Sequence, residues 1–376
     1  MKIDKYKYVS LQPMFKVCPS AQYYILVGQR SNGKTFCVLE RFIDNWWESK
    51  ETLSNAIIRR WEEDFNKAKG AKIFENFVSN TERGNIIASK TNNRYNSVLW
   101  YNRAWWAVYV NEKGENERIS SVPIAYAFAI SQEGHYKSGA YPRVKDILFD
   151  EMVSRSYLVD EFISFMNLIS TIVRLRDDLK IFMCGNTLSG YCPYFAEMGL
   201  KNIRGMKQGS IDLYKMGQDG RMKIVVYMTD SIAKKGKPSD IYFCFDNPEL
   251  RMVTGDAVWE LAIYPHCPTK YHPFEIKLVY FILFDGECFQ CEIINVKDEW
   301  FTFIHRKTTP IKDEDKVIIF KQEHDHRFNF RRRLTKPIDK VGKFIASFYT
   351  MDKVFYQDNE VGDMINQYLA WSTQAR

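Results

Sequence analysis

The sequence has no long hydrophobic run. Its two longest apolar stretches, residues 122–130 and 278–284, are much shorter than the roughly 20 residues that a membrane-spanning helix needs. Residues 1–13 are charged and lack the apolar core of a secretory signal peptide. The sequence also contains no repeats and no low-complexity tract. We therefore expect a soluble intracellular protein without a membrane segment.

The cysteines show no pattern that would indicate a disulfide framework or a zinc site. The eight cysteines are scattered along the chain, which favours reduced thiols in a cytosol. Cys288 and Cys291 have the C-x-x-C spacing, but they lie in a predicted strand, where positions three apart face opposite sides. No second C-x-x-C pair accompanies them, and His324 and His326 are equally weak as ligands. We expect neither zinc binding nor redox chemistry.

Charge of one sign is only moderately in excess. The net charge of +7 is compatible with an anionic partner such as nucleic acid, and equally with a solvated basic surface. The length of 376 residues exceeds what one hydrophobic core usually serves, so we expect two domains.

A glycine-rich loop between a predicted strand and a predicted helix is the most informative motif. Residues 23–27 predict a buried strand, and apolar side chains recur at helical spacing from residue 36 onward. The loop between them matches the Walker A pattern G-x-x-x-x-G-K-[ST] at every fixed position. It consists of Gly28, Gln29, Arg30, Ser31, Asn32, Gly33, Lys34 and Thr35.

This loop predicts a nucleotide site. Its backbone amides and the positive end of the following helix form a cradle for a triphosphate. Lys34 would reach the outer phosphates, and the hydroxyl group of Thr35 would bind Mg²⁺. ATP and Mg²⁺ are therefore the expected cofactors.

Two further strands end in polar residues suited to the same site. The apolar residues 147–149 precede Asp150 and Glu151, which we expect to act on Mg²⁺ and to polarise the attacking water, respectively. Residues 180–184 predict a strand that ends at Asn186. Asn186 is either a sensor of the γ-phosphate or an ordinary turn former.

The order of elements predicts an α/β fold with a mostly parallel sheet flanked by helices. Strands are predicted at residues 56–60, 97–101, 105–110 and 123–130, and a helix at 159–173. Ligands bind such sheets at the carboxyl ends of the strands. We therefore expect Gly28, Asp150 and Asn186 to meet at one site.

Arg174 and Arg176 end the predicted helix 159–173. Cations at a helix C-terminus are favoured by the helix dipole, which is a structural explanation. The functional alternative is an arginine finger that reaches the γ-phosphate bound by a neighbouring subunit. Spacing alone does not choose between the two explanations or between the two residues.

The composition changes after residue 228. We expect an ATPase domain at 1–228, a connection at 229–265 that contains Lys234 and Lys235, and a C-terminal domain at 266–376. A hairpin is predicted at 277–294, because its Asp-Gly pair suits a two-residue turn, and helix from residue 341.

The densest basic segment lies in the C-terminal domain and has Phe328 and Phe330 interleaved. Phosphate contacts with base stacking are one interpretation, and an amphipathic strand with both rings packed inward is the other. The candidate nucleic-acid contacts are Arg327, Arg331, Arg332, Arg333, Lys336 and, in the connection, Lys234 and Lys235.

The order of these motifs resembles that of the DNA-packaging (encapsidation) ATPases of small protein-primed podophages, the Picovirinae type. The resemblance rests on residues 25–35, on Arg59 and Arg60 after an apolar strand, on 137–151, and on 167–186. The resemblance is specific for most of the first domain. For the remainder it rests only on position in the chain and on the general pattern of residues. The chain is longer than expected between Lys34 and Asp150, where residues 91–118 are a candidate insert.

The resemblance implies an additional-strand, catalytic-glutamate (ASCE) ATPase in a homomeric ring, a pentamer, at a capsid portal in the host cytoplasm. Arg174 then corresponds to the trans-acting finger, and Lys137 to a second basic residue supplied across the subunit interface. The C-terminal domain would resemble a degenerate ribonuclease-H-like nuclease that binds nucleic acid without cutting it. In some relatives a structural RNA helps dock the ring, and the sequence does not decide whether this chain uses one.

We therefore predict an ATP-driven translocase of double-stranded viral DNA. Two alternatives stay open: a terminase-like ATPase with an active C-terminal nuclease, and a nucleotide-dependent assembly protein without translocation. The acids on the predicted hairpin, Asp285, Glu287 and Glu292, do not form a credible two-metal set.

Overall fold

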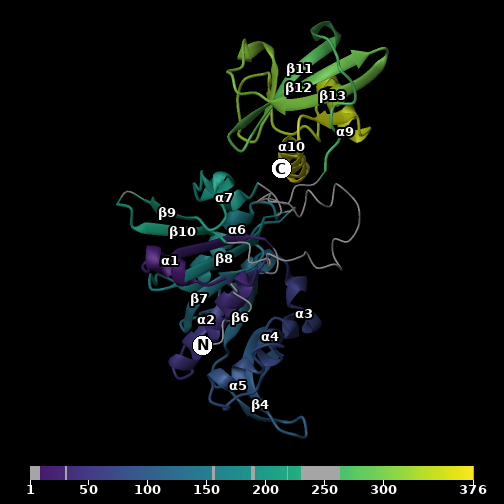
Figure 1. Cartoon of the computed structure of the whole chain (residues 1–376). Helices are drawn as coiled ribbons and strands as arrows, with labels where there is room; N and C mark the ends of the chain where they lie inside the picture. Colours follow the sequence, from purple (N-terminus) through teal and green to yellow (C-terminus); the bar gives the residue numbers. More distant parts are fainter. Residues whose placement is uncertain are drawn as a thin grey trace. The chain divides into compact units, whose positions relative to one another are not determined.

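The computed structural model describes residues 9–29, 32–154, 157–187, 191–217, 219–229 and 263–375. The predicted site residues Arg30 and Ser31, the linker residues Lys234 and Lys235, and most of the predicted connection 229–265 lie outside this part of the chain. The chain divides into two compact units, and Figure 1 shows the elements of each. The first comprises residues 1–154, 160–187 and 193–242.

The second unit comprises residues 243–376 together with two short segments, 155–159 and 188–192. These segments follow the strands that end at Phe149 and Asn186. The division predicted from composition, 1–228 and 266–376, did not separate them from the first domain. Their hydrophobic partners lie far along the chain, as the ring pair Tyr191–Phe284 within the second unit illustrates.

A large mixed sheet forms the centre of the first unit, in the order β3-β4-β6-β2-β7-β8-β1-β10-β9 with β5 paired to β4. The strands from β6 to β10 in this order are parallel, and β3, β4, β5 and β9 pair antiparallel. The predicted mostly parallel sheet is confirmed. The strands of this sheet are β1 Tyr23–Gly28, β2 Ser54–Arg59, β3 Ser97–Tyr101, β4 Ala104–Val110, β5 Asn116–Ile119, β6 Ala125–Ala129, β7 Val144–Phe149, β8 Lys180–Asn186, β9 Ile211–Met216 and β10 Met222–Met228.

Helices cover both faces of this sheet, which explains why its central strands are apolar throughout rather than alternating. On one face, α2 packs Val38, Leu39 and Phe42 into the core that contains Leu148. On the other face, Phe149 stacks on Phe165 of α6. The helices are α1 Gln12–Val17, α2 Lys34–Glu48, α3 Lys67–Lys72, α4 Glu75–Val78, α5 Ile86–Lys90, α6 Glu161–Val173 and α7 Pro193–Glu197, with short 3-10 turns η1 Glu62–Phe65, η2 Ile130–Tyr136 and η3 Ile203–Gly205.

The second unit is built on a sheet in the order β15-β14-β11-β12-β13-β16. β11, β12 and β13 form an antiparallel meander, whereas β14 is parallel to β11 and β15 is parallel to β14. The strands are β11 Ile276–Phe284, β12 Glu287–Val296, β13 Glu299–Arg306, β14 Ile318–Lys321, β15 Phe330–Arg331 and β16 Val354–Tyr356. The remaining elements are η4 Pro273–Glu275, η5 Glu314–Lys316, α9 Lys340–Thr350 and α10 Asn359–Gln374.

The predicted hairpin of the second unit is confirmed, because Phe284 pairs with Glu287 across a two-residue turn. Asp285 and Gly286 both have positive φ, 52° and 77°, as a type I′ turn requires. α9 and α10 contribute Ile345, Phe348 and Tyr368 to the core of this unit. No helix in the described residues is both long and apolar enough to cross a membrane.

Candidate nucleotide site and basic segment

The glycine-rich loop is fixed at both of its ends. A Cβ atom at Gly28 would lie 1.9 Å from Oγ1 of Thr229, so only glycine fits where β1 ends beside β10. Gly33 has φ = 86°, a left-handed conformation that glycine adopts without strain, and α2 begins at the next residue. The side chain of Asn32 donates to Thr229 Oγ1 at 2.6 Å. Thr229 was not predicted, and only its position at a strand end could have suggested it.

Lys34 lies at the centre of the loop and is only 5% exposed. Its ammonium group donates to the carbonyl oxygens of Gly28 and Gln29 at 3.0 and 2.7 Å. It also donates to the side-chain oxygens of Asn32 and Asn186, both at 3.1 Å. The structure therefore brings Asn186, at the end of β8, to the lysine of the loop, as its place in the sequence predicted.

The acidic strand β7 meets the loop through Thr35. The Thr35 hydroxyl donates to Asp150 Oδ1 at 2.7 Å, so the two predicted magnesium ligands are adjacent. The other carboxylate oxygen of Asp150 pairs with Arg59 at 2.7 Å. Burial opposes the charge of Arg59, but the neighbouring Asp150 and Glu151 outweigh it and raise the pKa of the guanidinium group. Arg59 entered the sequence analysis only through the family resemblance, without a role.

The residue predicted as general base, Glu151, is exposed and has an unusual backbone. Its φ of 60° is left-handed, a strained conformation for a residue other than glycine. Buried Arg60 donates to the carbonyl oxygens of Glu151 and Met152 at 3.2 and 3.0 Å. Arg60 also pairs with Glu161 at 2.7 Å, and Glu161 accepts a hydrogen bond from Tyr194 at 2.8 Å. This buried network holds the peptide that carries Glu151.

These residues surround a cavity of about 360 Å³. Its lining includes residues 32–35 of the loop, Asp150, Glu151 and Asn186 and, as a second wall, Ile73, Asn76 and Phe77. The cavity is of the size that small ligands occupy. A lysine at a helix N-terminus, next to adjacent hydroxyl and carboxylate oxygens, fits a triphosphate with a hard divalent cation. The second wall comes from the region between β2 and β3, which the sequence analysis did not assign to the site.

Arg174 and Lys137 lie together, away from this cavity. Arg174 caps α6 with φ = 43° and is exposed. Its guanidinium donates to the carbonyl oxygens of Lys137 and Gly139 at 3.0 and 2.7 Å. The Lys137 side chain is 62% exposed. Neither residue lines the cavity of its own chain.

Arg176 has a different environment. Its guanidinium donates to five backbone carbonyl oxygens, at distances of 2.7 to 3.1 Å. The acceptors lie in the last turn of α6 and in the segment that leads into β7. Arg176 therefore ties α6 to the start of the acidic strand, a structural role that the sequence left open.

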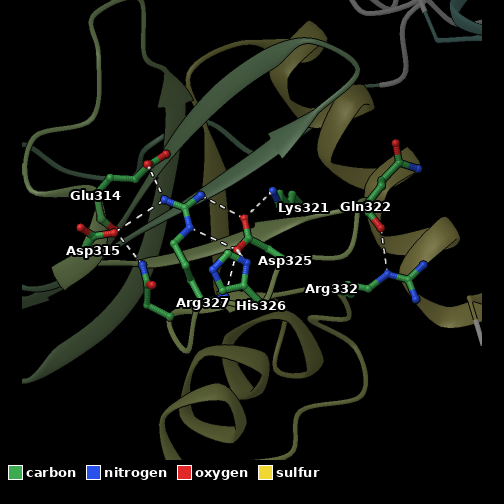
Figure 2. A network of polar contacts seen from close by, with 9 residues as sticks. Glu314, Asp315, Lys321, Gln322, Asp325, His326, Arg327 and Arg332 are labelled. Carbon is green, nitrogen blue, oxygen red and sulfur yellow. Dashed lines mark hydrogen bonds and ion pairs between the residues drawn. The ribbon is translucent and has the colours of Figure 1, made fainter.

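In the second unit, Arg327 of the basic segment is surrounded by carboxylates (Figure 2). It pairs with Glu314 at 2.8 Å, with Asp315 at 3.6 Å and with Asp325 at 3.0 Å. Arg327, with Lys321, holds the pKa of Asp325 well below its ordinary value. The positive charge of Arg327 is therefore balanced within the protein.

The two phenylalanines of this segment differ as well. Phe330 is buried, and its ring packs against Arg327 at 3.8 Å, whereas Phe328 is 95% exposed. Neither interpretation from the sequence holds for both rings. The remaining predicted contacts, Arg331, Arg332, Arg333 and Lys336, line a second cavity that is described below.

The acids of the predicted hairpin do not converge. No group of three metal-ligating side chains occurs in the part of the chain that the structure describes. Glu292 accepts hydrogen bonds from Tyr271 at 2.7 Å and Gln290 at 2.6 Å, and it pairs with His305 at 3.4 Å. Burial raises the pKa of both Cys288 and Cys291.

Comparisons with known proteins place similar sequences among phage DNA packaging proteins. The family model of the podovirus DNA encapsidation protein (Gp16) matches residues 72–205. The DNA packaging protein of Bacillus phage B103 is 32% identical over 92 residues, which are 23% of this chain and 29% of the relative. That of Bacillus phage phi29 is 31% identical over 87 residues, 22% of this chain and 26% of the relative. The predicted family resemblance is confirmed.

Solved structures extend the likeness in fold to nearly the whole chain. The Phi-28 gp11 DNA packaging motor has a TM-score of 0.52 at 17% identity and covers 99% of both chains. The phi29 genome packaging motor assembly has a TM-score of 0.54 at 15% identity, covering 97% of this chain and 99% of the other. By sequence, however, the matched segments span less than a third of the length of the curated relatives.

Proposed function

We propose that the chain is an ATP-hydrolysing subunit of a ring motor that moves double-stranded viral DNA into a preformed capsid. The convergence of Lys34, Thr35, Asp150 and Asn186 on one cavity carries this proposal. The matched relatives bear the name DNA packaging protein, which supports DNA packaging as the process that ATP hydrolysis drives.

Each subunit would bind Mg-ATP in the cavity of the first unit. The loop amides and Lys34 would bind the phosphates, and Thr35 and Asp150 would hold Mg²⁺, which neutralises the charge that develops on the phosphates. Glu151 would orient and deprotonate the attacking water, with its backbone held by Arg60. Asn186 would contact the γ-phosphate, because its side chain already accepts a hydrogen bond from Lys34, which would bind the outer phosphates.

A neighbouring subunit would complete this site. Arg174 and Lys137 are exposed, lie side by side, and do not line the cavity of their own chain. This placement supports a trans-acting finger at Arg174, whereas the bonds of Arg176 to five carbonyl oxygens support a structural role for it. We propose a homomeric ring, a pentamer, at the capsid portal in the host cytoplasm, with a structural RNA as a further partner.

The second unit would bind nucleic acid without cutting it. Its antiparallel meander continues through β11 into the parallel strands β14 and β15, with β16 parallel to β13 at the other edge, an arrangement that supports the expected ribonuclease-H-like fold. The acid of its β12 strand, Glu292, is engaged by Tyr271, Gln290 and His305. These observations support a vestigial nuclease rather than a working one.

Replacing Glu151 with Gln tests the proposed reaction. We expect steady-state ATP hydrolysis to fall by about 10²–10⁴-fold, because the general base is lost. Equilibrium binding of a fluorescent ATP analogue should be unchanged, since the phosphate and metal ligands remain. Undiminished hydrolysis would contradict the role of Glu151.

Double-stranded DNA provides the second arm of this test. In the unmodified chain, duplex DNA should stimulate hydrolysis, and ATP should drive displacement of a triplex-forming strand from that duplex. Hydrolysis without either effect would favour a nucleotide-dependent assembly protein instead of a motor.

A further inference from the structure

The second unit contains a cavity of about 330 Å³ whose lining is strongly basic. It lies between the end of the basic segment and the start of α9. The residues that matter for its chemistry are His324, Arg331, Arg332, Arg333, Lys336 and Gly342. Asp339 also lines it and pairs with Arg331 at 3.0 Å. Positive groups therefore outnumber negative ones around this cavity.

The contacts of Arg333 and Lys336 leave their charges uncompensated. Both donate to the carbonyl oxygen of Ala375, at 3.5 and 3.4 Å, a neutral acceptor near the end of α10. No carboxylate within the described ranges forms an ion pair with either side chain. An anion in the cavity would thus meet two cations whose charge no acid of the described chain cancels.

Arg331 contributes a donor at the wall of the same cavity. Its Nη1 atom is buried and has no hydrogen-bond partner among the residues that the structure describes. A Cβ atom at Gly342 would lie 3.4 Å from this nitrogen, so the absence of a side chain there leaves room beside it. A buried unpaired donor is costly unless a ligand or water satisfies it.

Arg327 shows that the basic segment is not uniform. It lies only four residues before Arg331, yet it is paired with Glu314, Asp315 and Asp325 and does not line the cavity. Figure 2 draws this network together with Arg332, which donates to the carbonyl oxygen of Gln322 at 2.8 Å. The segment therefore divides into a self-neutralised half and a half that faces the cavity.

We propose that this cavity binds a backbone phosphate of the nucleic acid on which the motor acts, with Arg333 and Lys336 as the contacts and Arg331 Nη1 as a further donor. The proposal rests on the proposed function for the identity of its ligand. Guanidinium groups match phosphate oxygens with two parallel hydrogen bonds, and phosphate contacts read no sequence, as a motor on arbitrary DNA needs. Arg327 then supports the fold of the segment without touching nucleic acid.

Salt-dependent binding by the full chain tests this site. Affinity for a fluorescent duplex is measured over a range of salt concentrations for the unmodified chain, for Arg333→Gln and for Lys336→Gln. Each variant should weaken binding uniformly across sequences and lower the slope of log affinity against log salt by about 1. Lys277→Gln, an exposed lysine of β11 outside the cavity, and Arg327→Gln are the matched controls, and both should leave the slope unchanged.

The ligand is resolved by parallel arms with single-stranded RNA of equal length and with inorganic phosphate. A larger loss for the duplex supports the proposal, whereas a larger loss for the RNA overturns it in favour of an RNA-binding cavity. Unchanged slopes in both cavity variants, or equal losses in Lys277→Gln, overturn it. Binding of inorganic phosphate that the cavity variants abolish, with unchanged affinity of these variants for both nucleic acids, also overturns it, in favour of a small-anion site.

ATP hydrolysis separates this proposal from the function on which it rests. The cavity variants lie outside the nucleotide site, so hydrolysis without DNA should match that of the unmodified chain. Intact hydrolysis with unchanged slopes rejects the cavity alone. Lost slopes in a chain that hydrolyses no ATP reject the motor and leave the cavity standing. Circular dichroism melting of each variant excludes misfolding as the cause.

Discussion

In the first unit, charged side chains converge on an open cavity, whereas in the second unit most of them converge on one another. Lys34, Asp150 and Glu151 line the cavity of the first unit. Arg327 and Asp325 of the second unit, by contrast, form an ion pair and neutralise each other. The same residue types therefore have opposite consequences, and only their partners distinguish them.

This difference teaches that density of charge in a sequence is a poor guide to a binding site. The nucleotide site uses few charges: Lys34 lies at the start of α2, and Asp150 and Glu151 follow β7. The basic run of the second unit concentrates its charges in a short segment, and the acids that neutralise Arg327 come from η5 and from the turn after β14. A site is indicated by charged groups that face a cavity, and the tertiary partners of each group decide whether it does.

The largest effects are expected when Arg174, proposed as a finger, and Arg176, bound within the fold, are each replaced by alanine. Arg174→Ala should lower ATP hydrolysis by about 10³-fold or more, because an arginine finger contributes that much to phosphoryl transfer. Its thermal stability should stay close to that of the unmodified chain, since the residue is exposed. Arg176→Ala should instead lower the melting temperature, because five carbonyl oxygens lose their donor.

Mixing experiments decide whether Arg174 acts on a neighbour. Subunits with Arg174→Ala retain their own Glu151, and subunits with Glu151→Gln retain the finger. A mixture should recover part of the hydrolysis that each variant lacks alone. If no mixture recovers any activity, the finger does not act across subunits.

A second test concerns the buried pair Arg60–Glu161, whose side chains are 5% and 1% exposed. Arg60→Met alone leaves a buried carboxylate without its cation, and we expect a loss of about 3–5 kcal/mol in the free energy of unfolding. The double variant Arg60→Met/Glu161→Leu should recover most of that stability, since apolar residues often replace a buried pair at little cost. Denaturant unfolding of the first unit measures both.

The double variant also separates stability from function. The carbonyl oxygens of Glu151 and Met152 remain without their donor, so hydrolysis should stay low although the fold is restored. Recovery of hydrolysis together with stability would show that Arg60 only supports the fold. The Tyr194→Phe variant, which removes the hydrogen bond from Tyr194 to Glu161, is the control for a mild disturbance of the same network.

Much of the first unit was predictable because its signals are local. The loop, its strand and its helix are contiguous in sequence, and the apolar strand ahead of Asp150 predicts where the acid lies. Parallel strands end at one edge of a sheet, so the meeting of Asn186 with Lys34 follows from the fold class. Arg60 and Thr229 could not be assigned in this way, because their partners are backbone atoms or side chains of distant segments.

The second unit was less predictable for the same physical reason. The hairpin at Asp285 and Gly286 was recognised from its turn residues. The division of the basic segment, however, depends on tertiary ion pairs that no spacing rule reveals. The opposite environments of Phe328 and Phe330 follow from the pairing of β15 with β14, which the sequence analysis did not predict.

The smallest expected effect concerns Glu292 of the second unit, whose carboxylate already has hydrogen-bond partners. The hydrogen bond to the Glu292 carboxylate raises the pKa of His305 above its ordinary value of 6.5, although partial burial opposes the charge. Burial opposes the charge of Glu292, but His305, Tyr271 and Gln290 outweigh it and lower its pKa below 4.5. Between the lowered pKa of Glu292 and the raised pKa of His305 both groups are charged, and the contribution of this ion pair to stability is largest there.

This contribution should disappear as the pH rises through the raised pKa of His305, and as it falls through the lowered pKa of Glu292. We expect the melting temperature to change by a few degrees at most, because a partly exposed ion pair contributes about 1 kcal/mol or less. Nuclear magnetic resonance of histidine-labelled protein gives the pKa directly, with His305→Gln identifying the resonance. Glu292→Gln should lower that pKa towards 6.5. An unchanged pKa in Glu292→Gln would mean that this carboxylate does not hold His305 in its charged form, and that Tyr271 and Gln290 are its partners without the histidine.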